Sequence, residues 1–288
     1  MFPVSAYTKA TINNEALVSR NAMEAMSITS KLHLKNAPVV ETALQIQFSD
    51  LPGWSTLYPG LYYPYIRERF PNFTHLPEIP PTVETFPASP KQLQFQLRLN
   101  QEIGCAQFET VDSERLIRAQ RNRFAYHWLS KSKELASYTS YEENLEICLN
   151  EFDTFSEFLQ ANSLPPVDPV LCEVMYLNHV RPNEGESLEA MVKDIFNTNL
   201  GSFELFTLNR TFVKEGRGRL YAELNTNFDD GSPFVTFQLT SRINHAEGDF
   251  KDSLNDAHDW LIDTFCKLTS SSAREDRWKE NDRVTNQR

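Results

Sequence analysis

Hydrophobic and polar residues alternate along several segments of the chain, with the period of two that is typical of β-strands with one buried face. In residues 39–48 the alternation places five side chains on one side, namely Val40, Thr42, Leu44, Ile46 and Phe48. The polar residues between them point the other way. Residues 92–99, with the sequence QLQFQLRL, show the same pattern. Both segments predict strands whose polar side stays outside the core.

The pattern changes between these two strands. Residues 59–70 fit a helix that ends before Pro71. Residues 71–90 contain six prolines, which exclude a helix or a central strand because proline lacks the backbone donor. We interpret this stretch as a long, ordered surface loop. Strands are expected again at 104–110 and within 114–128.

Two longer segments have apolar residues at helical spacing. Residues 141–160 begin after Ser140, which forms a capping box with Glu143. Residues 250–268 have an apolar face of Phe250, Leu254, Ala257, Leu261 and Phe265. Each segment therefore predicts an amphipathic helix that lies on a sheet.

The elements follow the same order twice. After the first series and the stiff stretch LPPVDP at 164–169, we expect a strand at 170–180, a helix at 187–196 and strands at 203–213, 218–228 and 234–243. The glycines of GRG at 216–218 indicate a turn between two of these strands.

This order predicts an α+β fold of two similar halves. Each half would consist of a strand, a helix, three or four antiparallel strands and a helix, and together they would form a curved antiparallel sheet backed by helices. We expect the halves at 31–163 and 170–270, joined by the 164–169 linker. Residues 1–30 are expected to be a disordered extension and residues 271–288 a polar tail that frays. The second face of the sheet would stay open.

Composition and charge narrow the range of possible functions. The net charge is −11, and residues 129–288 carry most of it, with 16 Lys and Arg against 28 Asp and Glu. This acidity disfavours general affinity for nucleic acid, which depends on cationic side chains. The sequence has no run of about 18 apolar residues and no signal-peptide core. We therefore expect a cytoplasmic protein without membrane contact, with its four cysteines as buried free thiols.

Familiar catalytic signatures are missing from the sequence. It contains neither a phosphate-binding G-x-x-x-x-G-K-[ST] loop nor G-x-G-x-x-G, G-x-S-x-G or H-E-x-x-H. The six histidines are spread singly, and no Cys or His spacing fits a metal site. We predict no catalytic residue, no metal site and no cofactor, which favours a binding protein over an enzyme.

The stretch RAQRNRFAYHW at 118–128 joins basic and aromatic residues. Cationic side chains on an open sheet face would bind phosphate or carboxylate groups, and the candidates are Arg98, Arg118, Arg121, Arg123 and His127. However, strand alternation places Phe124, Tyr126 and Trp128 on the opposite face. The aromatic side chains would then be buried, which weakens a stacking role toward single-stranded nucleic acid.

Two further sites are candidates. Asn178 and His179 end the first strand of the second half and would lie at the junction of the halves, where a small-ligand pocket or an active site would form. Alternatively, Asn178 and His179 are polar core residues with satisfied hydrogen bonds. The outer face of the last helix carries Asp252, Asp256, Asp259 and Asp263, an acidic surface that would suit a basic protein partner.

Several segments together resemble an uncharacterised, sporadically distributed bacterial protein family. They are NAPVVETALQIQF, RAQRNRFAYHW, YTSYEENLEICLNEFDTF, CEVMYLNHV, GRLYAEL, FQLTSR and LNDAHDWLIDTFCKLTSSSAREDRW, in this order over most of residues 36–278. The chain departs from the family at Thr139, where a proline is usual, and at His127, where an asparagine is usual. The resemblance implies an accessory system of the defence or toxin–antitoxin type. Its expected partner is a protein encoded nearby, and nucleic acid is the alternative.

Overall fold

The computed structural model describes residue 32 and residues 34–87, 104–131, 138–196 and 203–280. The strand expected at 92–99, with Arg98, and the extension expected at 1–30 lie outside the described residues.

Within these described residues, nine strands form one antiparallel sheet in the order β2-β3-β4-β5-β1-β6-β9-β8-β7. The strands are β1 (Val39–Phe48), β2 (Asn72–Leu76), β3 (Cys105–Glu109), β4 (Arg115–Gln120), β5 (Arg123–Leu129), β6 (Pro169–Val180), β7 (Thr207–Lys214), β8 (Gly218–Asp229) and β9 (Ser232–Asn244). The helices are α2 (Tyr58–Ile66), α3 (Tyr141–Ala161), α4 (Leu188–Phe196), α5 (Phe250–Leu268) and α6 (Ser271–Asp276).

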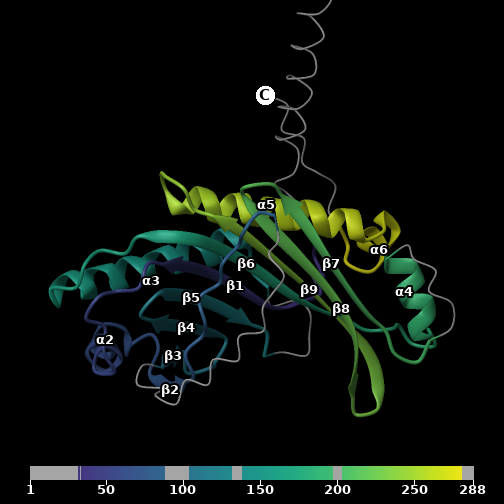
Figure 1. The fold of residues 1–288 in the computed structure, drawn as a ribbon. Helices are drawn as coiled ribbons and strands as arrows, with labels where there is room; N and C mark the ends of the chain where they lie inside the picture. The colour runs from purple at the N-terminus through teal and green to yellow at the C-terminus, as the bar shows by residue number, and fades with distance from the viewer. Residues whose placement is uncertain (1–31, 33, 88–103, 132–137, 197–202, 281–288) are drawn as a thin grey trace, which may run out of the picture.

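The long helices α3 and α5 lie on one face of the sheet (Figure 1). Their apolar faces cover the residues that alternation assigned to the inside, and Ile46, Phe155 and Leu261 are fully buried between the layers. The capping predicted for α3 is present, because the Ser140 side chain accepts a hydrogen bond from the backbone N–H of Glu143 at 3.1 Å. An α+β fold with a helix-backed antiparallel sheet is therefore confirmed.

The two expected halves share this sheet. β1 pairs with β6 in antiparallel register, with Glu41 opposite Leu177 and Gln47 opposite Leu171. From this central pair the order runs β1-β5-β4-β3 on one side and β6-β9-β8-β7 on the other, and β2 extends the first side by one strand. The central pair thus makes one continuous sheet across the 164–169 linker.

The proline-rich stretch, which we interpreted as a loop throughout, contains an edge strand. β2 pairs with β3 over its whole length, from Asn72 opposite Glu109 to Leu76 opposite Cys105. The prolines bracket this strand, with Pro71 before it and Pro77 after it. β2 also lies at the end of the sheet, where proline near a strand disturbs the fewest ladder bonds.

Residues 271–280 are ordered, although we expected them to belong to a frayed tail. Ser270 caps α6 by accepting a hydrogen bond from the N–H of Ala273 at 3.1 Å. Trp278 is buried, and its ring packs against Phe265 with the ring centroids 5.4 Å apart. Leu34 forms an antiparallel bridge with Glu280. One buried aromatic residue thus fixes a segment whose composition is otherwise polar.

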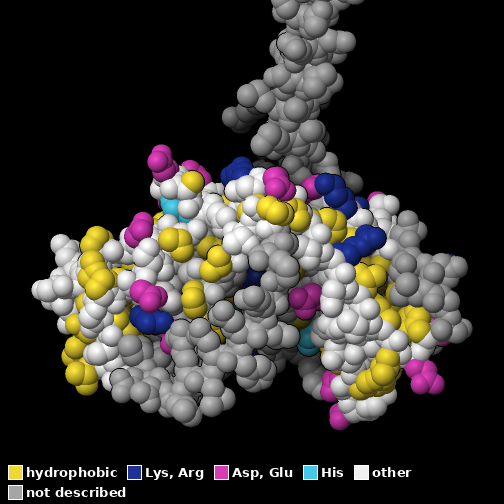
Figure 2. Space-filling model, viewed as in Figure 1, with side chains coloured by type: hydrophobic (Ala, Val, Ile, Leu, Met, Phe, Trp, Pro, Cys, Tyr) yellow, Lys and Arg dark blue, Asp and Glu magenta, His cyan; other side chains and the backbone are white. Residues whose placement is uncertain are grey.

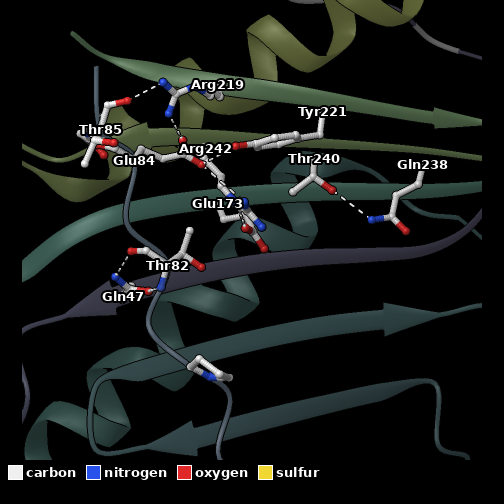
Figure 3. A network of polar contacts seen from close by, with 12 residues as sticks. Gln47, Thr82, Glu84, Thr85, Glu173, Arg219, Tyr221, Gln238, Thr240 and Arg242 are labelled. Carbon is white, nitrogen blue, oxygen red and sulfur yellow. Dashed lines mark hydrogen bonds and ion pairs between the residues drawn. The ribbon is translucent and has the colours of Figure 1, made fainter. Parts of the chain in front are cut away.

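The face of the sheet opposite α3 and α5, here called the polar face, is not open as we expected. Residues 78–86, here called the strap, cross it from β4 to β8 in an extended conformation (Figures 1 and 3). Pro80 and Pro81 favour this conformation, because proline restricts its own φ angle and holds the preceding residue away from the helical region.

No helix in the described part of the chain is long and apolar enough to cross a membrane.

Candidate functional site

The basic and aromatic halves of residues 118–128 serve opposite faces of the sheet, as alternation predicted. Phe124 contacts Phe152 of α3, with ring centroids 5.5 Å apart. The hydroxyl of Tyr126 donates a hydrogen bond to Asn144 of α3 at 3.1 Å. Arg123 and His127 lie on the polar face instead. The aromatic side chains are therefore core residues and provide no stacking surface for a nucleic acid.

The arginines of this stretch bind groups of the same chain. Arg121 pairs with Glu78 of the strap at 2.8 Å and with Asp50 at 3.3 Å. Arg118 donates a hydrogen bond to Gln107 at 2.8 Å. These contacts neutralise or occupy the side chains that an external phosphate would need, so the arrangement does not favour the nucleic-acid interpretation.

Arg123 is held most tightly of the three. It is 4% exposed, donates to Gln45 and to Gln47 at 3.0 Å each, and donates to the backbone carbonyl of Pro80 at 3.0 Å. Burial lowers the pKa of its guanidinium. Its Nε and the Nε2 of Gln45 are buried without a hydrogen-bond partner in the described part of the chain. The polar face thus offers more donors than the strap occupies.

Glu84 of the strap lies at the centre of a charged network (Figure 3). Its side chain is 3% exposed and accepts hydrogen bonds from Arg219 at 2.5 Å and from the hydroxyl of Tyr221 at 2.8 Å. Arg242 lies 3.4 Å from the same carboxylate and pairs with Glu173 at 2.5 Å. The two arginines and the tyrosine form a three-armed carboxylate clamp, contributed by β8 and β9.

Two glutamines hold the backbone of the strap. The Gln47 amide donates to the carbonyl of Thr82 at 2.8 Å and accepts from the Thr82 N–H at 2.7 Å. Gln120 makes the same paired contact with Ile79, at 2.8 and 3.1 Å. Each primary amide therefore imitates the pairing that a neighbouring strand would give. The sequence placed Gln47 on the polar face but gave no signal for its partner.

His127 forms a buried pair with Glu41 on the polar face. The Nδ1 of His127 lies 2.9 Å from a carboxylate oxygen of Glu41. Burial lowers the pKa of His127, and the hydrogen bond from His127 lowers the pKa of Glu41. The neutral ring therefore donates its Nδ1–H to an ionised carboxylate. His127 serves this internal pair, not an external anion.

The lowered pKa values predict a loss of stability in acid. Both groups release protons more readily in the folded than in the unfolded state, so the unfolded state binds more protons as the pH falls below 6.5, the ordinary value for histidine. Urea unfolding at pH 7, 6 and 5 should show a falling free energy of unfolding. His127→Asn should flatten this dependence but not remove it, because burial also lowers the pKa of His179. Equal slopes for the variant and the wild type would contradict this assignment.

Asn178 and His179 point to opposite faces of β6, because they are neighbours on one strand. Asn178 lines a pocket of about 420 Å³ on the helix side, here called the junction pocket. His179 lines a wider hollow of about 890 Å³ at the same end of the β1–β6 pair. The structure thus places hollows where the sequence predicted a junction site, but the two residues do not share one.

The junction pocket has aromatic walls with a few polar groups. The hydroxyls of Tyr138 and Tyr176 lie 2.8 Å apart, and the ring of His258 stacks on Tyr141 with the centroids 3.7 Å apart. Burial raises the pKa of all three tyrosines, so they remain neutral phenols at physiological pH. Asn178 donates to the carbonyl of Phe237 at 2.9 Å. The sequence missed the tyrosines and His258 as a group, because they come from α3, β6, α5 and the segment before α3.

The wider hollow has mixed charge. Arg181 pairs with Asp229 at 2.9 Å, and its guanidinium lies over the ring of Phe234, 4.6 Å from the centroid. Arg277 pairs with Glu186 and lies 3.5 Å from Asp194. Burial lowers the pKa of His179, which leaves this ring neutral. The hollow therefore lacks the excess of one charge that would select an ionic ligand.

The acidic residues of α5 are partly neutralised within the chain. Asp256 pairs with Arg217, and Asp263 pairs with Lys267. Asp259 lies 3.5 Å from the Nδ1 of His258, and Asp252 is exposed in the first turn. Along the edge of the molecule where α5 lies, cationic and acidic side chains are interspersed (Figure 2). This mixture weakens the case for an acidic docking surface.

Within the described residues, no group of three or more His, Cys, Asp and Glu side chains is arranged to hold a metal ion. Cys105, Cys148 and Cys172 are buried free thiols, and burial raises the pKa of Cys105 to about 11. These cysteines are therefore weak nucleophiles.

Comparison with known proteins gives no family assignment. No protein-family model matches the chain, and no curated protein matches it.

Proposed function

We propose that this protein is a non-enzymatic binding protein and that the junction pocket is its small-ligand site. The observation that carries the proposal is the pocket of about 420 Å³ beside Asn178, whose walls combine aliphatic and aromatic side chains with a few polar groups. A concave, mostly apolar site with a few convergent polar groups is the usual form of a ligand site.

The walls define the chemistry of the ligand. Leu34, Val39, Leu261 and Phe265 would contact an apolar body. The Tyr138 and Tyr176 hydroxyls and the His258 ring would bind one or two polar groups at its end. Among the described lining residues, Lys35 and Glu142 carry opposite charges and no cationic cluster is present, so the ligand would be a small, partly aromatic or aliphatic molecule of low charge.

The proposal includes an origin of the site in two repeated halves. The mirrored strand order around β1 and β6 supports this interpretation, because the pocket then lies at the contact of two similar units. We also propose, from the family resemblance alone, that the protein belongs to an accessory bacterial system and has a protein partner encoded nearby.

Filling the pocket should abolish ligand binding. Ile262 lines the pocket from α5, and Ile262→Trp should place an indole in it. With 1-anilinonaphthalene-8-sulfonate as the probe, the wild type should show saturable fluorescence enhancement, and the variant should bind about tenfold more weakly or worse. Ile147→Trp is the matched control, because Ile147 is equally half-buried on α3 but lies outside the pocket. Equal binding by both variants and the wild type would contradict the proposed site.

A further inference from the structure

The strap lies on the polar face as a bound peptide lies in a groove. It is extended and crosses the sheet from β4 to β8. Its contacts come from side chains of β4, β5, β1, β9 and β8. The strap contains no residue of a named strand or helix. Its position therefore depends on side-chain contacts and not on a β-ladder.

Most of these contacts are made to the backbone of the strap. Gln120 binds Ile79 and Gln47 binds Thr82 through paired amide hydrogen bonds. Arg123 binds the carbonyl of Pro80, and Arg219 binds the carbonyl of Thr85. Contacts to backbone groups accept many side-chain sequences, which is how proteins bind extended peptides in general.

Glu84 is the strap side chain that the groove buries most deeply, whereas Glu78 at the other end pairs with Arg121 and is more exposed. The carboxylate of Glu84 fills the clamp formed by Arg219, Arg242 and Tyr221. The neighbouring Val83 is 75% exposed, so the groove does not restrict the side chain at this position. The groove thus selects a glutamate two residues after the Thr82 position and tolerates variation between the two.

The strap does not satisfy every donor beneath it. Among the residues that the structure describes, the Nε of Arg123 and the Nε2 of Gln45 have no partner, although both residues are more than nine-tenths buried. Buried donors of this kind are normally paired. A peptide with one further acceptor at this point would bind more completely than the strap does.

We propose that the polar face is a groove for an extended, proline-containing segment of a partner protein with a glutamate at the clamp, and that the strap occupies it as an internal pseudo-ligand. A tethered segment acts at an effective concentration of about millimolar or more, so a partner segment must displace the strap. The groove and the junction pocket lie on opposite faces of the sheet, which makes this inference independent of the proposed ligand site.

The test uses the strap sequence itself as a probe. A fluorescent peptide of residues 77–87, PEIPPTVETFP, is titrated against the full chain and followed by fluorescence anisotropy. Wild type should bind weakly because its own strap competes. Glu84→Gln weakens the internal ligand at the clamp and should bind the peptide about tenfold more tightly or better. The peptide should also raise the melting temperature of this variant by several degrees, because it restores a carboxylate to the two arginines.

A peptide with glutamine at the clamp position is the matched control. It should show neither the gain in affinity nor the rise in melting temperature. A second variant, Thr82→Pro, removes the N–H that donates to Gln47 and leaves the buried charges in place. It should also bind the glutamate peptide more tightly than wild type does, and it serves as the test if Glu84→Gln does not fold.

Three results would overturn the proposal. The first is that neither variant binds the peptide more tightly than wild type. The second is that both peptides bind Glu84→Gln equally well. The third is that a single-stranded oligonucleotide, and not the peptide, binds when the strap is weakened. If the fluorescent probe does not bind in the junction pocket, the proposed ligand site is wrong, but these three peptide and oligonucleotide measurements are not affected.

Discussion

Replacing Glu84 with glutamine is expected to lower the free energy of unfolding by about 3–5 kcal/mol, the usual cost of removing one partner from a buried ion pair. Arg219 faces Glu84 with a side chain that is only 9% exposed. Without the carboxylate, its charge is left in a poorly solvated site, with the carbonyl of Thr85 and the ring of Phe86 as its remaining contacts. Arg242 loses less, because it retains Glu173.

Urea unfolding followed by tryptophan fluorescence measures this effect. Asp229→Asn provides the control, since it removes a carboxylate from an exposed pair with Arg181, in which the side chains are 41% and 47% exposed. Surface pairs contribute about 0–1 kcal/mol, so the control should remain close to wild type. A Glu84→Gln variant as stable as Asp229→Asn would mean that water reaches Arg219 and that the network is not a buried one.

The elements of this fold were largely predictable because each depends on local patterning. Alternation located β1, a mostly apolar run located β6, and the apolar spacing with Ser140 located α3. β7 begins at Thr207, whereas the pattern placed its start at 203. Two predictions were wrong where a single feature decided the outcome. β2 lies between prolines, and Trp278 fixes a segment that composition marked as a tail.

The strap was not predictable, because its contacts join residues far apart in sequence. Gln47 and Thr82 are 35 residues apart, and Glu84 and Arg219 are 135 apart. Glutamine is common at solvent-facing strand positions, so Gln47 gave no signal of a contact. A proline-rich stretch predicts a loop, and its sequence does not show which surface the loop lies on. The arginines of 118–128 show the same limit. Their residue types predicted binding of external anions, and this stays a prediction. In the structure Arg121 pairs with carboxylates of the chain itself, whereas Arg118 and Arg123 donate to amide and carbonyl oxygens.

For the hollows at the end of β6, the sequence predicted the position only. Asn178 and His179 were placed at the contact of the halves because they end a strand, and hollows lie on both sides of that strand end. Their division between the faces follows from the period of two. The aromatic walls come from α3, α5 and β6, and no single stretch of sequence shows that these surfaces meet.

Replacing Phe155 with alanine is expected to cost about 3–5 kcal/mol of unfolding free energy, the range for deleting a large buried aromatic side chain. Phe155 is fully buried on α3 and contacts the rings of Phe48, Tyr62 and Phe124. The lost side chain would leave a cavity between α3 and the first half of the sheet. Leu57→Ala, at a residue that is 74% exposed, should change stability by less than about 0.5 kcal/mol.

The Phe155→Ala variant also tests whether the two halves are separate folding units. The β1–β6 pair and the strap both cross the boundary, and Glu84 of the first half neutralises Arg219 of the second. Unfolding of the first half would therefore expose the edge of β6 and leave Arg219 without its carboxylate. Hydrogen exchange of Phe155→Ala should show faster exchange in β8 and β9 as well as in β4 and β5. Protection of β8 and β9 at wild-type levels would instead establish two independent units, because the damage would then have stopped at the central strand pair.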